Sequence, residues 1–388
     1  MFSQNLLNLG TETAFSVLAR AEELEKAGHS IINLGIGQPD FSTPPHIVEA
    51  GIKALQDGAH GYTSSMGLAQ LREALKEDLT ERYGYCPPIS QILITPGGKP
   101  IIFMAAMIYG GKEKEIILPD PSFPIYKSSV AYSGAKPVTY GLNEKNGFAF
   151  NADEILSNIT SRTSMIIINS PHNPTGGVTP ASEISKLVNG LLSYPDITLF
   201  SDEIYDRLVF ETQPHSLLCY PEIQNRLIIL NGWSKTYAMT GWRIGFGIWP
   251  ERSVEFADKI GVNYHSCVNA ATQHAALAAT TGDQSCVENM RVVFKRRAKL
   301  ITESLNNITG LNCQLPSGAF YAFPNITGLG LSSDDMQTKL LEEYGVASLA
   351  GTAFGYNGEG YLRLSSANSD ESIIKACNMM KKLANSRG

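Results

Sequence analysis

The feature that most constrains the fold is an alternation of short apolar runs with amphipathic helical patterns, between about residue 30 and residue 280. Runs that are apolar throughout are typical of parallel strands, because helices cover both faces of a parallel sheet. One intervening helix is expected at Ile101–Tyr109, and another with Thr179 as its cap and Pro180 at its first position. The runs are IINLGIG, QILIT, EIILPD, MIIINS, ITLFS and RLIIL. We therefore expect an α/β fold with a mostly parallel sheet flanked by helices.

The pattern changes after residue 280, where longer charged helices replace the regular alternation. A chain of 388 residues also exceeds the size at which a single hydrophobic core stops growing. We expect a large domain over residues 41–282. Residues 1–40 and 283–388 are expected to form a smaller α/β domain, with the N-terminal helix (about Glu12 to Ala27) folding back onto it.

Composition restricts the classes of partner. The net charge is −6 and no block of like charges occurs, so neither nucleic acid nor a membrane surface is an expected partner. The longest apolar run, Ile101–Tyr109, is far shorter than the roughly 20 residues of a membrane span. The six cysteines are scattered without the spacing of a metal site, and the first residues lack the pattern of a signal peptide. We expect a cytoplasmic protein without a metal.

Polar residues gather where the predicted strands end. In an open parallel sheet, ligands bind outside the carboxyl ends of the strands. Taken singly, each segment could be a tight turn, a helix cap or a surface ion pair; taken together, one ligand explains them all. The segments are Gly97-Gly98-Lys99 after QILIT, Ser122-Phe123 after EIILPD, Asn173 after MIIINS, Asp202 and Tyr205 after ITLFS, and Ser234-Lys235 with Arg243 after RLIIL.

Three chemical needs define that ligand. Helix-start N–H groups, a serine and an arginine bind phosphate, and a lysine in a walled pocket is the nucleophile for an aldehyde. The carboxylate of Asp202 suits a basic ring nitrogen. Two nucleotide-binding motifs are incomplete. Gly97-Gly98-Lys99 is followed by Pro100 and so does not match the Walker motif, and Gly35 and Gly37 lack the third glycine of the dinucleotide-binding fingerprint. Pyridoxal 5′-phosphate meets all three needs.

Four segments together resemble the class I aminotransferases of the aspartate aminotransferase fold. Each is a weak signal alone, but their combination is highly specific. They are NSPHNPTGG, SDEIYDRLVF, NGWSKTYAMTGWRIGFG and GYLRLS. The resemblance spans nearly the whole chain, from INLGIGQPDF and GYTSSMGLAQLREAL onward. It implies the fold type I of pyridoxal-phosphate enzymes, with a seven-stranded, mostly parallel sheet and a smaller second domain. It also implies a homodimer whose active sites are completed across the interface.

The resemblance further implies roles for single residues. Lys235 would hold the cofactor as a Schiff base and carry the substrate proton, while Asp202 would keep the ring nitrogen protonated. Arg363 would clamp the substrate carboxylate with a bidentate fork, which a lysine could not replace. The remaining implied contacts are Tyr205 and Asn173 to the ring oxygen, Phe123 on the ring face, Gly98, Lys99, Ser234, Arg243 and the partner subunit's Tyr62 to the phosphate, and Gly37 and Asn173 to the substrate.

The predicted activity is transfer of an amino group from an L-amino acid to a 2-oxo acid through a pyridoxamine phosphate intermediate. A C–S or β-lyase of the same fold is the alternative, and a non-catalytic regulator would need a further binding module that we do not find. Departures from relatives concern the substrate side chain: Ser266-Cys267-Val268-Asn269 and Ala350 replace commoner residues, and Met107 stands where acidic-substrate relatives often have lysine. An apolar or broad preference is therefore as well supported as aspartate.

Overall fold

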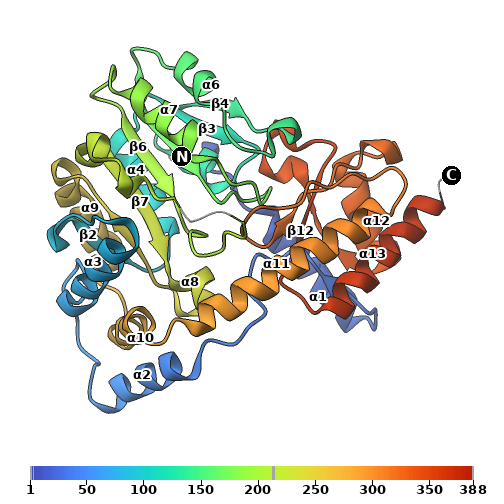
Figure 1. Cartoon of the computed structure of the whole chain (residues 1–388), viewed down its shortest axis with the longest axis horizontal. Helices are drawn as coiled ribbons and strands as arrows, with labels where there is room; N and C mark the ends of the chain where they lie inside the picture. Colours follow the sequence, from blue (N-terminus) through green and yellow to red (C-terminus); the bar gives the residue numbers. More distant parts are fainter. Residues whose placement is uncertain (1, 3, 212–214, 387–388) are drawn as a thin grey trace.

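The computed structural model describes residues 2, 4–211 and 215–386, and its centre is a seven-stranded sheet (Figure 1). The five strands from β7 to β4 in the sheet order run parallel, and β8 is antiparallel to both β2 and β7. The mostly parallel sheet predicted from the sequence is thus confirmed. In spatial order the strands are β2 (Ile92–Thr95), β8 (Gly245–Ile248), β7 (Leu227–Gly232), β6 (Thr198–Asp202), β5 (Thr163–Asn169), β3 (Glu115–Asp120) and β4 (Lys136–Gly141).

Two helical layers bury opposite faces of this sheet. On β5, Met165 and Ile167 point into one core while Ile166 and Ile168 point into the other, because successive strand residues alternate between faces. Helices α4 (Lys99–Tyr109), α5 (Ile125–Tyr132) and α9 (Glu251–His265) cover the first face. The second face is covered by α2 (Pro45–Gln56), α3 (Ala69–Tyr83), α6 (Ala152–Ser157), α7 (Ala181–Leu191) and α10 (Ala270–Thr281).

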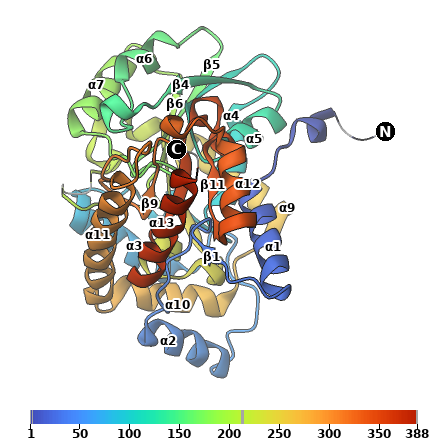
Figure 2. The ribbon, with the colours of Figure 1, turned by 90° about the vertical axis from the view of Figure 1, so that its right-hand side faces the viewer.

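A second, smaller unit packs beside the large sheet. Its strands are β9 (Tyr321–Ala322), β11 (Leu349–Ala350) and β12 (Leu362–Ser365), which form an antiparallel sheet, and β1 (Ile32–Asn33), which pairs in parallel with β10 (Val346–Ala347). Its helices are α1 (Thr13–Lys26), α11 (Ser285–Asn306), α12 (Ser333–Tyr344) and α13 (Asp370–Asn385) (Figure 2).

The N-terminal segment shares the core of this smaller unit. Ile32 and Leu34 pack with residues of α11, α12 and α13, and α1 packs through Val17 and Leu24 against the segment around Leu349. The predicted return of the N-terminal helix onto the C-terminal part is therefore what the structure has. The domain boundaries at residues 40 and 282 stay a prediction.

Two local expectations differ from the structure. Helix α7 begins at Ala181, with Pro180 rather than Thr179 at the N-cap position and no side-chain cap. The N–H of Thr179 instead donates to Ser170 Oγ at 3.0 Å, which holds this residue in the preceding loop. The first predicted strand is reduced to two residues, because Asn33 Oδ1 accepts the N–H of Gly35 at 2.9 Å and turns the chain.

None of the described helices combines the length and the apolar composition that crossing a bilayer would need. Within the same described ranges, no group of three or more His, Cys, Asp or Glu side chains is arranged to hold a metal ion.

Candidate active site

The predicted site residues meet at one edge of the large sheet. Gly98 is the N-cap residue of α4, shortly after the end of β2; Phe123 follows β3, and Asp202 ends β6. Lys235 lies on the single helical turn α8 (Trp233–Thr236), which leaves β7 without an intervening loop. Parallel strands bring their carboxyl ends to the same edge, so residues far apart in sequence converge there.

The amine of Lys235 is the centre of this cluster. Its Nζ donates a hydrogen bond to the carbonyl oxygen of Gly37 at 2.6 Å and lies 5.8 Å from the centre of the Phe320 ring. Burial, followed by the positive charges of Arg363 and Arg243, lowers the pKa of Lys235 to about 8. With that pKa, about a tenth of the amine is neutral, and thus nucleophilic, at pH 7.

Asp202 provides a buried carboxylate near that amine. Burial raises the pKa of Asp202 to about 6, against the opposing effect of hydrogen bonds from Tyr126 and from the N–H of Ile204 and of the charge on Lys235. The Tyr126 hydroxyl donates to Asp202 Oδ2 at 2.5 Å, and the Ile204 N–H donates to Oδ1 at 3.1 Å. These donors favour the ionised carboxylate that a protonated ring nitrogen would need.

Tyr205 and Tyr321 join the large and the small unit. Their hydroxyls are 2.8 Å apart, and their rings meet edge to face with centres 5.8 Å apart. Burial raises the pKa of Tyr205 well above its usual range, so its hydroxyl stays protonated and can donate a hydrogen bond. Gly37 lies against Tyr321 so closely that a Cβ there would come within 2.2 Å of the tyrosine hydroxyl. Only glycine fits at that position.

Arg363 is buried on β12 and faces the same space. Its Nη1 donates to Asn173 Oδ1 at 3.1 Å and its Nη2 donates to the Gly35 carbonyl at 2.6 Å. The guanidinium carbon lies 4.6 Å from the Tyr321 ring centre and 4.9 Å from that of Phe354. The buried Nε has no hydrogen-bond partner among the described residues. A buried guanidinium with spare donor capacity is suited to binding a carboxylate.

The start of α4 is a candidate anion site. Gly97 has a positive φ of 89°, and a Cβ on it would come within 2.4 Å of Arg243 Nη2. The guanidinium therefore lies directly over the glycine turn that presents the first N–H groups of the helix, those of Gly98 and Lys99. Ser234 is buried at the start of α8. Free N–H groups, the positive end of a helix and an arginine together favour a phosphate.

Two predicted residues lie differently. The Phe123 ring meets Tyr126 edge to face, with centres 5.8 Å apart, and remains half-buried. Tyr62 is 92% exposed in the single chain, as a residue that reaches into a partner subunit would be. Sequence reasoning missed Tyr126 and Tyr321, because a tyrosine within an apolar segment reads as core packing and only the fold reveals what its hydroxyl contacts.

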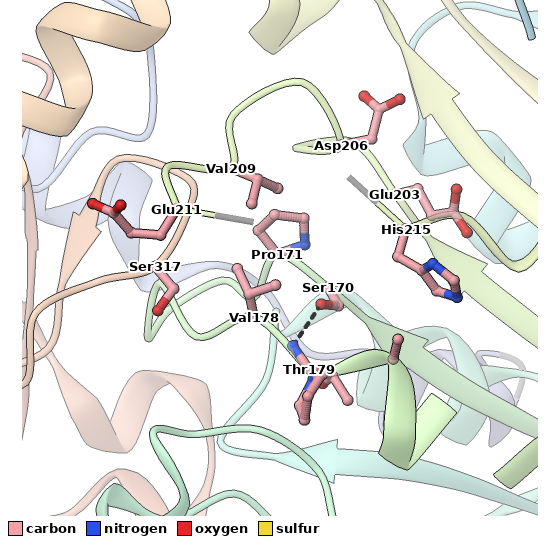
Figure 3. A pocket seen from close by; sticks show the side chains of 12 residues that line it. Ser170, Pro171, Val178, Thr179, Glu203, Asp206, Val209, Glu211, His215 and Ser317 are labelled. Carbon is pink, nitrogen blue, oxygen red and sulfur yellow. Dashed lines mark hydrogen bonds between the residues drawn. The ribbon is translucent and has the colours of Figure 1, made fainter. Parts of the chain in front are cut away.

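A cavity of about 390 Å³ lies close by but has the wrong chemistry for a phosphate (Figure 3). Three carboxylates line it, those of Glu203, Asp206 and Glu211, which would repel an anion. The other lining residues are Ser170, Pro171, Val178, Thr179, Pro180, Ala181, Val209, His215 and Ser317.

The residues at the sheet edge fit pyridoxal phosphate. They supply an amine whose pKa is lowered to about 8, a buried carboxylate, an arginine over a glycine turn, and a second arginine with an unpartnered buried Nε. Each of these groups is chemically suited to bind one part of the cofactor or of an amino acid attached to it. Together with the seven-stranded sheet, they define a pyridoxal-phosphate enzyme of fold type I.

Comparison with known proteins agrees with this class. The family model for aminotransferase class I and II matches residues 29–379. The aspartate aminotransferase of Pyrococcus horikoshii is 37% identical over 94% of this chain and 92% of its own length. The aromatic-amino-acid aminotransferase 2 of Thermococcus litoralis is 36% identical over 95% of each chain. The crystal structure of the aspartate aminotransferase from Rhizobium meliloti superposes with a TM-score of 0.94 at 30% identity and covers 99% of both chains.

The chain therefore belongs to the class I and II aminotransferases and is a pyridoxal-phosphate-dependent transaminase. The predictions of fold, family, enzyme class and cofactor are confirmed. The relatives carry the names of transaminases and not of lyases, so the alternative of a C–S or β-lyase is not favoured.

Proposed function

We propose that Lys235, Asp202 and Tyr205 carry out transamination between an L-amino acid and a 2-oxo acid. The observation that carries the proposal is the Lys235 amine, with a pKa lowered to about 8, placed among Asp202, Arg363 and the anion site at the start of α4. A group that must take up and release a proton at neutral pH works best when its pKa lies near that pH.

When bound, pyridoxal phosphate supplies an aldehyde that takes up amino groups and a ring that stabilises negative charge on the neighbouring carbon. Lys235 holds and moves the proton of the substrate α-carbon at its Nζ. Asp202, whose ionised form Tyr126 favours, would hold a proton on the ring nitrogen. Arg363 binds the substrate α-carboxylate, with Asn173 and the backbone at Gly37 beside it.

The remaining cofactor contacts follow from the anion site. The N–H groups of Gly98 and Lys99, the Ser234 hydroxyl and the Arg243 guanidinium would bind the phosphate, and Asn173 and Tyr205 would donate to the ring oxygen. Phe123 would pack on the ring face. Because Arg243 lies over Gly97, its charge is already in place before the phosphate arrives, and little reorganisation is needed.

We further propose a cytoplasmic homodimer in which Tyr62 of each subunit reaches the phosphate of the other. The exposure of Tyr62 supports this, and so do exposed apolar side chains on two helices. These are Ile52 and Leu55 on α2, and Phe256, Val262 and Tyr264 on α9. The six free cysteines suit a reducing compartment.

The test combines product stoichiometry with a variant. The purified enzyme, given an amino donor and a 2-oxo acid, should form a new amino acid and a new 2-oxo acid in equal amounts without ammonia. Release of ammonia from a cysteine-like substrate would instead indicate a lyase. Lys235→Ala should bind the cofactor without being covalently fixed to it by borohydride and should lose turnover, and normal activity in that variant would overturn the assignment.

A further inference from the structure

The N-terminal end of helix α1 places a carboxylate beside the first turn of α4. Glu12 is the N-cap residue of α1, but its side chain makes no cap hydrogen bond to the helix. The carboxylate instead forms an ion pair with Lys99 Nζ, at the first turn of α4. The Glu12 side chain is only 16% exposed. An acidic residue that could cap its own helix is thus turned into the site.

Two anchors fix the position of this segment. Gly10 and Ser128 on α5 exchange two hydrogen bonds of 3.0 and 3.1 Å, and these attach the chain just before Glu12 to the large unit. After Glu12, helix α1 is packed on the smaller unit through Val17 and Leu24. Glu12 is therefore held between these two attachments and beside Lys99.

The ion pair lies next to the reacting centre. Lys99 Nζ is 5.7 Å from the ring centre of Phe123, the residue expected to pack on the cofactor, and 5.6 Å from that of Phe15. The charges of both members reach Lys235: Glu12 raises the pKa of its amine and Lys99 lowers it. Glu12 also acts in the same way on the hydroxyl of Tyr321.

The cations that act on Lys235 are assigned to different groups of the ligands. Arg363 is assigned to the α-carboxylate of the substrate, and Arg243 is assigned to the phosphate. Among the described residues of this chain, Lys99 is the remaining cation that influences the Lys235 amine, and it is the one placed to receive a second carboxylate on a substrate side chain. Its ammonium is already neutralised by Glu12. A dicarboxylic substrate would have to displace Glu12 or lie beside it, and like charges brought together in a partly buried site repel strongly.

We propose that Glu12 is a specificity-determining residue that makes this transaminase favour amino acids with uncharged side chains over aspartate and glutamate. The proposal rests on the transaminase function given above. Glu12 would select through an unfavourable contact with a dicarboxylic substrate, in addition to any favourable contact with an uncharged side chain. The relatives, which include both aspartate and aromatic aminotransferases, leave the choice open.

The experiment compares two ligands of equal chain length, succinate and butyrate, which differ by one carboxylate. Their affinities for the cofactor-loaded enzyme are measured by calorimetric titration, together with kcat/KM for aspartate and 2-aminobutyrate. The wild-type enzyme should bind butyrate at least as tightly as succinate and should prefer 2-aminobutyrate. In Glu12→Gln the ratio of succinate to butyrate affinity should rise roughly tenfold, because Lys99 is released.

Three further variants make the test specific. Glu12→Asp keeps the charge and should stay close to the wild-type ratio. Glu22→Gln removes an exposed carboxylate from the same helix and should leave the ratio unchanged. Lys99→Gln leaves Glu12 without its cation and should lower the ratio. The proposal is overturned if Glu12→Gln changes the ratio by less than about twofold, if Glu22→Gln gives the same rise, or if the wild-type enzyme prefers the dicarboxylate.

Failure of this proposal can be told apart from failure of the transaminase function. Transfer of an amino group from 2-aminobutyrate and the absorbance of the bound cofactor report the function. The affinity ratio reports Glu12 and needs no turnover.

Discussion

Single side chains at this site owe their chemistry to burial and to neighbouring charge. The pKa values of Lys235 and Asp202 are brought closer together. Burial and two arginines lower the pKa of the Lys235 amine to about 8, and burial raises the pKa of the Asp202 carboxylate to about 6. The amine therefore changes protonation near neutral pH, while hydrogen bonds from Tyr126 and the Ile204 N–H favour the ionised carboxylate of Asp202. The same residues on the surface would keep their ordinary ionisation.

The shift at Lys235 predicts how its amine reacts in the cofactor-free protein. The rate of modification by an amine-selective reagent should rise through pH about 8 at Lys235, whereas lysines with the ordinary pKa of 10.5 should respond only at higher pH. The direction follows because only the neutral amine is nucleophilic. Labelling across a pH series, read by mass spectrometry of the peptides, measures both. A reactivity midpoint near 10.5 at Lys235 would contradict the shift.

The hydrogen bond from Tyr126 to Asp202 gives a second prediction. Tyr126→Phe removes a donor to a buried carboxylate, so the pKa of Asp202 should rise further above its ordinary value. A hydrogen bond to a charged group is worth roughly 1.5–3 kcal/mol, so the dissociation constant of the cofactor should increase by about 10- to 100-fold.

Equilibrium dialysis of the cofactor measures this loss. Tyr109→Phe is the control, because the buried Tyr109 hydroxyl has no hydrogen-bond partner among the described residues and its loss should leave cofactor binding unaltered. Equal cofactor affinity in Tyr126→Phe and the wild-type protein would mean that Tyr126 only packs.

At the scale of elements, the site is a consequence of where strands end. The runs that became β2, β3, β5, β6 and β7 were recognised from sequence because each contains consecutive apolar residues. Strands β4 and β8 were not singled out. β4 lies at the sheet edge with exposed residues and a proline, and β8 alternates glycine with apolar residues, so neither has the continuous apolar pattern.

Helix α3 is joined to the segment after β6 by a buried ionic network. Arg82 Nη1 and the Tyr83 hydroxyl each lie 2.8 Å from Asp206 Oδ2, and Arg82 also pairs with Asp78 at 2.6 Å. Asp206→Asn removes the charge that accepts from Arg82 and Tyr83, while Asp78 still pairs with Arg82. The substitution should therefore lower the free energy of unfolding by about 1.5–3 kcal/mol, the value of a hydrogen bond to a charged group.

Chemical denaturation monitored by fluorescence measures this loss of stability. Glu303→Gln is the matched control, since its pair with Lys299 is exposed and 3.7 Å long, and it should cost less than about 1 kcal/mol. An equal cost in both variants would show that the burial of Asp206 adds nothing.

At the scale of the whole molecule, the proposed dimer shares its sites between subunits. Tyr62→Ala should weaken cofactor binding in its partner's site, and Lys235→Ala should abolish turnover in its own. A hybrid dimer of the two variants contains one site with both residues intact. If subunits mix at random, about a quarter of all sites should regain activity.

The measurement is the activity of the two purified variants after they are unfolded and refolded together, compared with each refolded alone. Lys235→Ala combined with Lys235→Met is the control mixture and should stay inactive. Absence of recovery in the test mixture, with hybrid dimers demonstrated by mass, would place Tyr62 outside the shared site.

The sequence by itself determined the α/β class and the mostly parallel sheet, and its resemblance to the class I aminotransferases supplied the predicted site residues. It could do so because the apolar period and the polar residues at strand ends are local patterns, written in consecutive positions. Only the tertiary structure decided which distant groups touch. The pairings of Tyr126 with Asp202, of Tyr205 with Tyr321, and of Glu12 with Lys99 depend on the packing of separate elements, and the pKa values of Lys235 and Asp202 depend on burial that no local pattern encodes.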